Sequence, residues 1–133
     1  GALGLLLASQ EVAPGMAKRG HGAIGVTGAT GSWRAKVKAG GFAPGKFAGR
    51  AMAQSLAREL GPQGVHVFHV VVDGIVLMTP EERRKLPDIP ANHWMMPEDI
   101  AETYYNLVMQ PRSAWTFETS LCAWGDFDTM YSI

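Results

Sequence analysis

The sequence predicts an α/β fold, in which about three parallel strands form part of a doubly wound sheet with helices on its faces. Short β-branched runs alternate along the chain with longer segments of helical periodicity, a pattern typical of parallel sheets with right-handed crossovers. The 133 residues suit one domain, and 47% of them are apolar, which is enough for a hydrophobic core. We expect a single domain over residues 1–124 and an irregular tail over residues 125–133.

The first half of the chain contains two predicted helices and one predicted strand. Leucines at near-helical spacing predict a helix over residues 2–19, distorted near Pro14. The run GAIGVTGA (22–29) is short, β-branched and flanked by glycine, which indicates a buried strand. Residues 30–41 are basic with glycines at both ends, and we expect a loop there. A clear apolar stripe predicts a helix over residues 43–60.

The second half begins with VHVFHVVVD (65–73), a nearly continuous β-branched run typical of a strand covered on both faces. TPEERRKL (79–86) has a capping-box pattern and predicts a short helix, and we expect a loop over residues 86–97. A proline followed by two acids opens a predicted helix over residues 97–110. The last predicted strand lies within residues 114–124.

Composition excludes several classes of function. The 12 basic and 12 acidic side chains give zero net charge, so a nucleic-acid partner is not expected. The single cysteine, Cys122, excludes an internal disulfide and paired-cysteine zinc sites, and we expect it to be a small buried residue. His66 and His69 lie three apart on a predicted strand and should point to opposite faces, so no metal site is expected.

No apolar run approaches the about 18 residues of a membrane-spanning helix. The apolar opening of the chain lacks the basic flank and cleavage site of a signal peptide. We therefore expect a soluble protein of the cytoplasm or an organellar interior rather than a secreted one. The chain starts without Met in the middle of an apolar run, so we also expect that residues precede Gly1.

The segment GAIGVTGATGSW…GGFAPGKFAGRAMAQSLARELGPQGVHVFHVVVDG (22–74) resembles the short-chain dehydrogenase/reductase family. It has a strand, a loop, an aromatic-x-x-x-Lys sequence at a helix start and a second strand, in the family's order. PEDIAETYYNLV (97–108) resembles the family's penultimate helix, and SAWTFETSL (113–121) resembles its last strand. The resemblance implies the C-terminal half of a Rossmann-like fold, with NAD(P) as the family's cofactor.

The resemblance also implies catalytic positions for Asn, Ser, Tyr and Lys. The lysine matches Lys46, but the tyrosine position four residues earlier is Phe42, whose ring has no proton to donate. The serine position falls on Ala29, and the asparagine position falls on Gly1. Three of the four roles are therefore empty, and Lys46 is interpreted as the remnant of a catalytic pair. Without the resemblance, Lys46 would be interpreted as a helix lysine whose stem lies along an apolar surface.

Cofactor binding has only weak candidates in this chain. Besides Lys46, which in the family holds the ribose, Asp73-Gly74 stands where the family has Pro-Gly beside the nicotinamide. Two glycine patterns are poor dinucleotide turns, because GHGAIG (20–25) precedes a strand and VTGATGS (26–32) is not followed by a helix. We expect no cofactor in this chain, and NAD(P) only if an N-terminal half exists.

These observations favour a dehydrogenase-derived pseudoenzyme that acts as a structural or accessory subunit of a larger assembly. The outer edge of strand 23–29 should be open, so we expect a protein partner, a second copy or an N-terminal segment of the same protein to cover it. The apolar tail residues are further candidates for an interface, namely Trp124, Phe127, Met130 and Tyr131. One alternative is an NAD(P)-dependent oxidoreductase of which this chain is a fragment. Another is a regulatory module that binds a nucleotide without chemistry.

Overall fold

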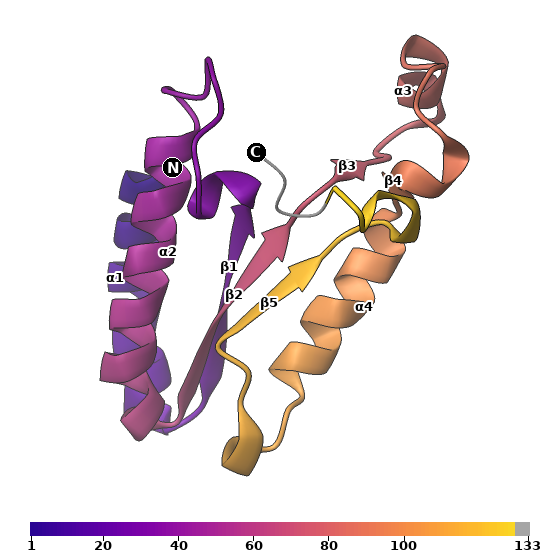
Figure 1. Cartoon of the computed structure of the whole chain (residues 1–133). Helices are drawn as coiled ribbons and strands as arrows, with labels where there is room; N and C mark the ends of the chain where they lie inside the picture. Colours follow the sequence, from indigo (N-terminus) through magenta and orange to yellow (C-terminus); the bar gives the residue numbers. More distant parts are fainter. Residues whose placement is uncertain (130–133) are drawn as a thin grey trace.

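The computed structural model describes residues 1–129. These residues form four α-helices and five strands, and helices alternate with strands along most of the chain (Figure 1). The helices are α1 (Ala2–Arg19), α2 (Ala43–Leu60), α3 (Pro80–Lys85) and α4 (Pro97–Val108). The strands are β1 (Gly22–Ala29), β2 (Val65–Val72), β3 (Ile75–Val76), β4 (Trp94–Met95) and β5 (Glu118–Leu121).

The main sheet has three parallel strands, as the sequence predicts, and their order is β1-β2-β5. β1 and β2 pair along their whole length, whereas β5 pairs only with the second half of β2, where Glu118 lies beside His69. β3 and β4 form a second, two-stranded sheet inside a region predicted to be mostly loop and short helix. Strands of two residues are too short to show the alternation by which a sequence reveals them.

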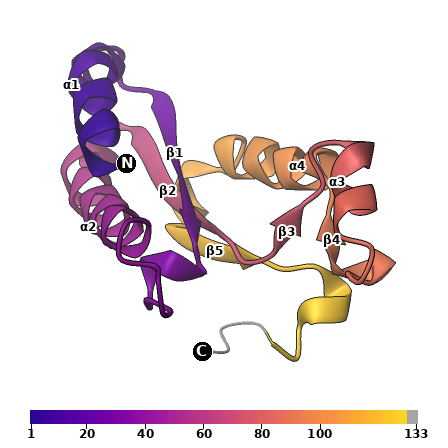
Figure 2. The same ribbon diagram turned by 90° about the horizontal axis from the view of Figure 1, so that it is seen from above.

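β2 lies at the centre of the molecule, and seven of its eight residues are buried, which agrees with the prediction of a strand covered on both faces. Val65 and Val67 pack against Ala13 of α1 and Leu60 of α2. The alternate residues, including Phe68 and Val70, face the other way and pack against α4. Helices therefore cover both faces of the sheet, α1 and α2 on one side and α4 on the other (Figure 2).

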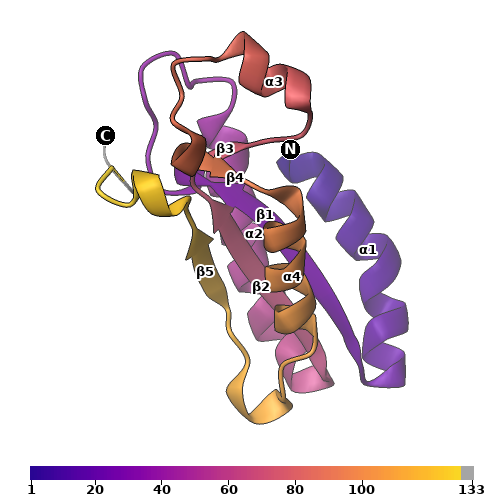
Figure 3. The same ribbon diagram turned by 90° about the vertical axis from the view of Figure 1, so that its right-hand side faces the viewer.

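The connections between strands correct one expectation. The chain steps across the sheet in one direction, from β1 to β2 and then to β5, but it passes through α2 on one face and α4 on the opposite face. Two such crossovers have opposite hands, so the expectation of right-handed crossovers throughout is wrong for one of them. The long connection between β2 and α4 is the physical reason. It carries α3 over the carboxyl ends of the strands and brings the chain to the other face (Figure 3).

Several elements differ from their predictions in extent or burial. α1 runs unbroken through Pro14 and ends at Gly20, whose φ of 72° is left-handed, a conformation that glycine adopts easily. Only two of the eight residues of β1 are buried, while four are half-buried and two are exposed, because β1 is an edge strand. Cys122 is half-buried, not buried as expected.

The predicted helix over residues 97–110 ends at Val108, and the strand predicted within residues 114–124 is limited to β5. In the tail, Trp124 and Phe127 are exposed, whereas Met130 and Tyr131 lie outside the described residues. Within residues 1–129, no helix has the length and hydrophobicity needed to cross a bilayer.

Candidate functional site

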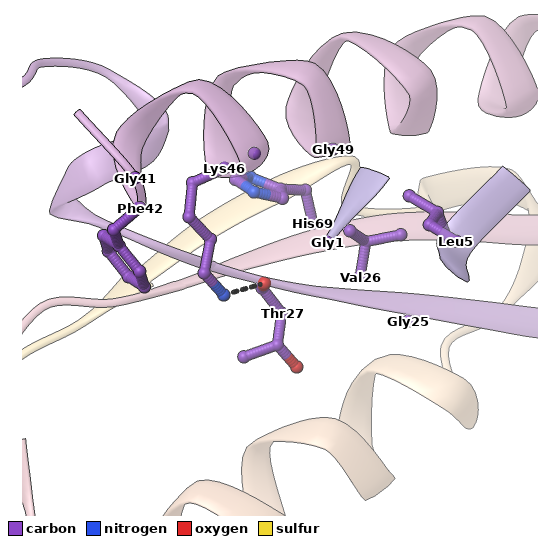
Figure 4. Close-up of a pocket in the computed structure, with 11 residues that line it drawn as sticks. Gly1, Leu5, Gly25, Val26, Thr27, Gly41, Phe42, Lys46, Gly49 and His69 are labelled. Carbon is purple, nitrogen blue, oxygen red and sulfur yellow. Dashed lines mark hydrogen bonds between the residues drawn. The ribbon is translucent and has the colours of Figure 1, made fainter. Parts of the chain in front are cut away.

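The candidate site is a cavity of about 450 Å³ between the first turns of α1 and α2, over the C-terminal half of β1 (Figure 4). Three of the four positions taken from the family resemblance line it, namely Gly1, Phe42 and Lys46. Ala29, the predicted serine position, is not among the residues lining the cavity and lies at the end of β1. Thus the fold brings together most of the predicted catalytic positions, although they lie on separate elements.

Lys46 and Phe42 lie one helical turn apart at the start of α2, and this spacing places both side chains on one face. The Lys46 ammonium is 5.6 Å from the centroid of the Phe42 ring, within range of a cation–π contact. Lys46 Nζ also donates a hydrogen bond to the backbone carbonyl of Thr27, at 2.9 Å (Figure 4). Phe42 is about half exposed, with 53% of its surface accessible. The lysine is therefore held between β1 and an exposed aromatic ring.

The carbonyl that Lys46 binds lies on the open edge of the sheet. The N–H of His69 donates to Phe117 on the β5 side, so the backbone groups of the neighbouring β2 residue Phe68 point toward β1. Phe68 pairs with Gly25, and in a parallel pair this directs the backbone groups of Gly25 and Thr27 away from β2. Lys46 thus satisfies one acceptor on the outer edge of β1 and places a charge there, and charged side chains blunt exposed strand edges.

A buried polar network lies beneath the cavity and joins four separate elements. Glu118 of β5 accepts hydrogen bonds from Arg50 of α2 through Nε at 2.7 Å and Nη2 at 3.0 Å, and its Oε2 lies 2.7 Å from His69 Nδ1. On the other side of the imidazole, Nε2 lies 3.4 Å from the hydroxyl of Ser32. Ser32 also accepts the N–H of Ala29, at 3.2 Å. The network therefore fixes the 3-10 turn that follows β1.

Protonation in this network follows from burial and pairing. Burial lowers the pKa of His69, and the hydrogen bond to Glu118 offsets only part of this effect. Burial alone would raise the pKa of Glu118, but hydrogen bonds from Arg50 and His69 outweigh it and hold that pKa below its ordinary value. The same carboxylate raises the pKa of Arg50. His69 is thus neutral at pH 7, with Nδ1–H directed at a charged Glu118.

The order Ser32–His69–Glu118 resembles the arrangement of a hydrolytic triad, which was not expected from the sequence. However, Ser32 and His69 are each only 1% exposed, so no substrate carbonyl reaches the hydroxyl. Ser32 therefore does not act as a nucleophile, and the three side chains instead hold β2, β5 and the turn after β1 together. No local sequence signal could reveal it, because Glu118 reaches His69 only through the register of β5 with β2.

The two histidines of β2 point to opposite faces, as predicted. His69 faces the network under α2, whereas the His66 ring stacks on Trp115, with centroids 4.7 Å apart and planes 3° apart. Within the described part of the chain, no group of three or more His, Cys, Asp or Glu side chains is placed to hold a metal ion.

The weak cofactor candidates Asp73 and Gly74 do not line the cavity that contains Lys46. Asp73 accepts a hydrogen bond from the hydroxyl of Thr30, which ties the end of β2 to the turn after β1. A Cβ at Gly74 would lie 2.8 Å from the sulfur of Met95, so the backbone of Gly74 packs closely against a side chain of β4. Both residues have structural contacts that account for them without a cofactor.

A dinucleotide does not fit the glycine patterns of residues 1–129. GHGAIG (20–25) leads into β1, and VTGATGS (26–32) leads into a 3-10 turn and a loop. Neither pattern opens an α-helix, whose N-terminal N–H groups are the usual pyrophosphate ligands in this class of fold. These two glycine patterns therefore lack the strand–turn–helix arrangement of a dinucleotide-binding turn.

No family model matches the chain. A short-chain dehydrogenase from Rhodopseudomonas palustris is 37% identical to it, with a TM-score of 0.65 over 85% of this chain. The chain therefore has a partial short-chain dehydrogenase/reductase fold. A short-chain dehydrogenase from Bacillus anthracis (24% identity, TM-score 0.73, 90% of this chain) and a serine dehydrogenase complexed with NADP⁺ (19%, 0.74, 89%) share the fold.

The chain spans about half the length of the solved structures it matches. It covers 43% of the Rhodopseudomonas palustris chain, 49% of the Bacillus anthracis chain and 50% of the serine dehydrogenase chain. The fold assignment made from the sequence is thereby confirmed, together with the partial extent of the fold.

Proposed function

We propose that this chain is a dehydrogenase-derived accessory or structural subunit that has lost hydride-transfer chemistry. The observation that supports this proposal most strongly is the phenyl ring of Phe42, which lies beside Lys46 where a carbonyl reductase needs its proton donor. Carbonyl reduction requires a proton at the oxygen as hydride reaches the carbon, and a hydrocarbon ring supplies none.

The other polar groups around the cavity do not replace that donor. Lys46 Nζ already donates a hydrogen bond to the Thr27 carbonyl. His69 is buried and neutral, and its Nδ1–H is directed at Glu118. The Thr27 hydroxyl lies 2.7 Å from the Tyr104 hydroxyl, on the α4 side of the sheet. Burial raises the pKa of Tyr104, which makes that phenol a weaker acid than a free one.

A role within an assembly is supported by the sheet edge. β1 pairs with β2 on one side only, and among the described residues two side chains bind its outer backbone, Lys46 at the Thr27 carbonyl and Ser32 at the Ala29 N–H. A strand edge of this kind is a template for pairing with another chain. We therefore expect β1 to be covered by a protein partner or by a second copy of the chain.

Turnover measurements test the loss of chemistry. The wild-type protein and its Phe42→Tyr and Phe42→Leu variants are assayed with NADH and NADPH against a panel of aldehydes and ketones. We expect no turnover above the buffer rate for wild type or for Phe42→Leu, which controls for a change of side chain without a new acid. Wild-type turnover well above that rate would overturn the proposal, whatever Phe42→Tyr does.

The second candidate is an NAD(P)-dependent oxidoreductase of which this chain is a part. It is favoured by the 37% identity to a dehydrogenase and by the presence of a lysine at the start of α2. Native mass spectrometry of the protein from its own source separates the two candidates. A chain near 14.3 kDa in a complex without nucleotide supports the accessory role. A chain roughly twice as heavy with a bound dinucleotide supports the oxidoreductase.

A further inference from the structure

A second cavity lies at the carboxyl end of β5 and shares no lining residue with the cavity around Lys46. Its volume is about 350 Å³, within the lower range of small-molecule sites. It lies where β4, the first turns of α4 and the segment after β5 meet (Figure 1). Open α/β sheets generally bind ligands in crevices at the carboxyl ends of their strands, so this location suits a binding site.

Aromatic rings from two distant parts of the chain form much of the wall of this cavity. Trp94 comes from β4, whereas Trp124 and Phe127 follow β5. Trp124 is 79% exposed and Phe127 is 58% exposed, so large apolar rings face water beside an open cavity. The Trp94 ring is buried, and its indole N–H has no acceptor among the described residues. Exposed aromatic surface around a cavity is a frequent mark of a recognition site.

The charge around the cavity is negative. Asp99 lines it, and no lysine, arginine or histidine is among the described residues that do. The pKa of the Cys122 thiol, which also lines the cavity, is raised first by burial and then by the nearby carboxylates of Asp126 and Asp73. The carboxylate of Asp126 lies 3.5 Å from His93 Nδ1.

The N-terminus of α4 also meets the cavity, and it carries about half a positive charge. Glu98 and Asp99 in the first turn of that helix contribute two full negative charges and outweigh it. An anion is therefore disfavoured here, despite the helix terminus.

We infer that this cavity binds a small organic ammonium compound, with its cationic nitrogen over the aromatic faces and beside Asp99. Cations within about 6 Å of a tryptophan or phenylalanine ring are attracted by the ring quadrupole, and the attraction grows when water is excluded. Met95 and Met96 supply adaptable apolar contacts for the body of the ligand. The inference does not depend on the function proposed above, because it uses a different cavity and different residues.

The four tryptophans of the chain provide a direct test, with benzyltrimethylammonium as the probe. Trp94 and Trp124 line the cavity, whereas Trp33 and Trp115 do not. In ¹H–¹⁵N spectra of the full chain, assigned with single Trp→Phe variants, we expect saturable shifts of the Trp94 and Trp124 indole signals. The signals of Trp33 and Trp115 should stay in place. Phenylacetate, which has a similar ring and the opposite charge, should bind at least roughly tenfold more weakly.

Two variants with a matched control complete the test. Asp99→Asn keeps the shape of the side chain and removes its charge, and Trp124→Leu removes an exposed ring, so neither should unfold the protein. Each should weaken binding of the probe by roughly tenfold, whereas Glu98→Gln, in the same helical turn but outside the cavity lining, should have little effect. The inference is overturned if the Trp94 and Trp124 signals do not shift, if phenylacetate binds equally well, or if Asp99→Asn and Glu98→Gln behave alike.

Discussion

Single residues determine how closely the backbone approaches the polar network beneath the candidate site. Gly28 is the clearest case, because a Cβ there would lie 2.2 Å from His69 Nε2 and 2.8 Å from the Ser32 hydroxyl. His69 has little room to move, since it is buried and held by Glu118. The glycine is thus required by the network and not by a turn, because Gly28 lies within β1.

We expect Gly28→Ala to lower the free energy of unfolding by about 1–3 kcal/mol, the usual cost of forcing an extra methyl group into a packed site. Urea denaturation followed by circular dichroism measures it. Gly49→Ala is the control, because a Cβ at this helical position meets nothing within 4 Å. Alanine should stabilise α2 there by up to about 1 kcal/mol. Equal effects of the two substitutions would show that Gly28 does not contact the network as described.

At the scale of elements, the network makes the docking of β5 depend on protonation. Arg50, His69 and Glu118 connect α2, β2 and β5, and their pKa values are shifted by burial and by one another. The folded pKa values of His69 and Glu118 both lie below their ordinary values of 6.5 and 4.5. Between the ordinary pKa of each group and its lower folded pKa, the unfolded chain binds more protons than the folded chain. Stability therefore falls as the pH falls through these two ranges.

We therefore expect the free energy of unfolding to fall in two stages on acidification. The first stage begins near pH 6.5, where the unfolded chain protonates His69 and the folded chain does not. The second begins near pH 4.5, when stability from the charged Glu118 is lost as the pH approaches its lowered folded value. Urea unfolding at several pH values between 7 and 3 measures both stages. A His69→Gln variant that keeps the full wild-type slope below pH 6.5 would contradict the assignment of the first stage.

The same scale shows what the sequence could and could not predict. The elements α1, α2, β1 and β2 were predictable because their periodicity is local and each is at least eight residues long. The polar network around His69 was not predictable, because strand register alone brings Glu118 beside His69. The opposite-handed crossover was also missed, since the route of the chain over the sheet depends on packing rather than on any local pattern. At the candidate site, spacing correctly placed Phe42 beside Lys46, but not the bond from Lys46 to the edge of β1.

At the scale of the whole molecule, the open edge of β1 governs association. Lys46 binds one outward-facing carbonyl of that edge and also places a charge beside it. Charged side chains, lysine in particular, discourage pairing of exposed strands with other chains. The lysine therefore has a structural role that does not depend on catalysis.

We expect Lys46→Met to increase self-association, because the substitution frees the Thr27 carbonyl and removes the charge while keeping side-chain length. Sedimentation velocity over a range of concentrations measures the effect. Lys36→Met makes the same change of charge at an exposed loop position and serves as the control. If both variants sediment like the wild-type protein, Lys46 does not protect the edge.

The central position of β2 also has a consequence during synthesis on the ribosome. β1, α2 and β2 are contiguous in sequence and can assemble as soon as Val72 has emerged, but β5 does not exist until Leu121 has been added. At roughly 5–20 residues per second, translation of the intervening segment takes a few seconds. During that interval the second edge of a strand rich in valine has no neighbour within the chain, and unpaired strand edges of this kind make folding intermediates prone to aggregation.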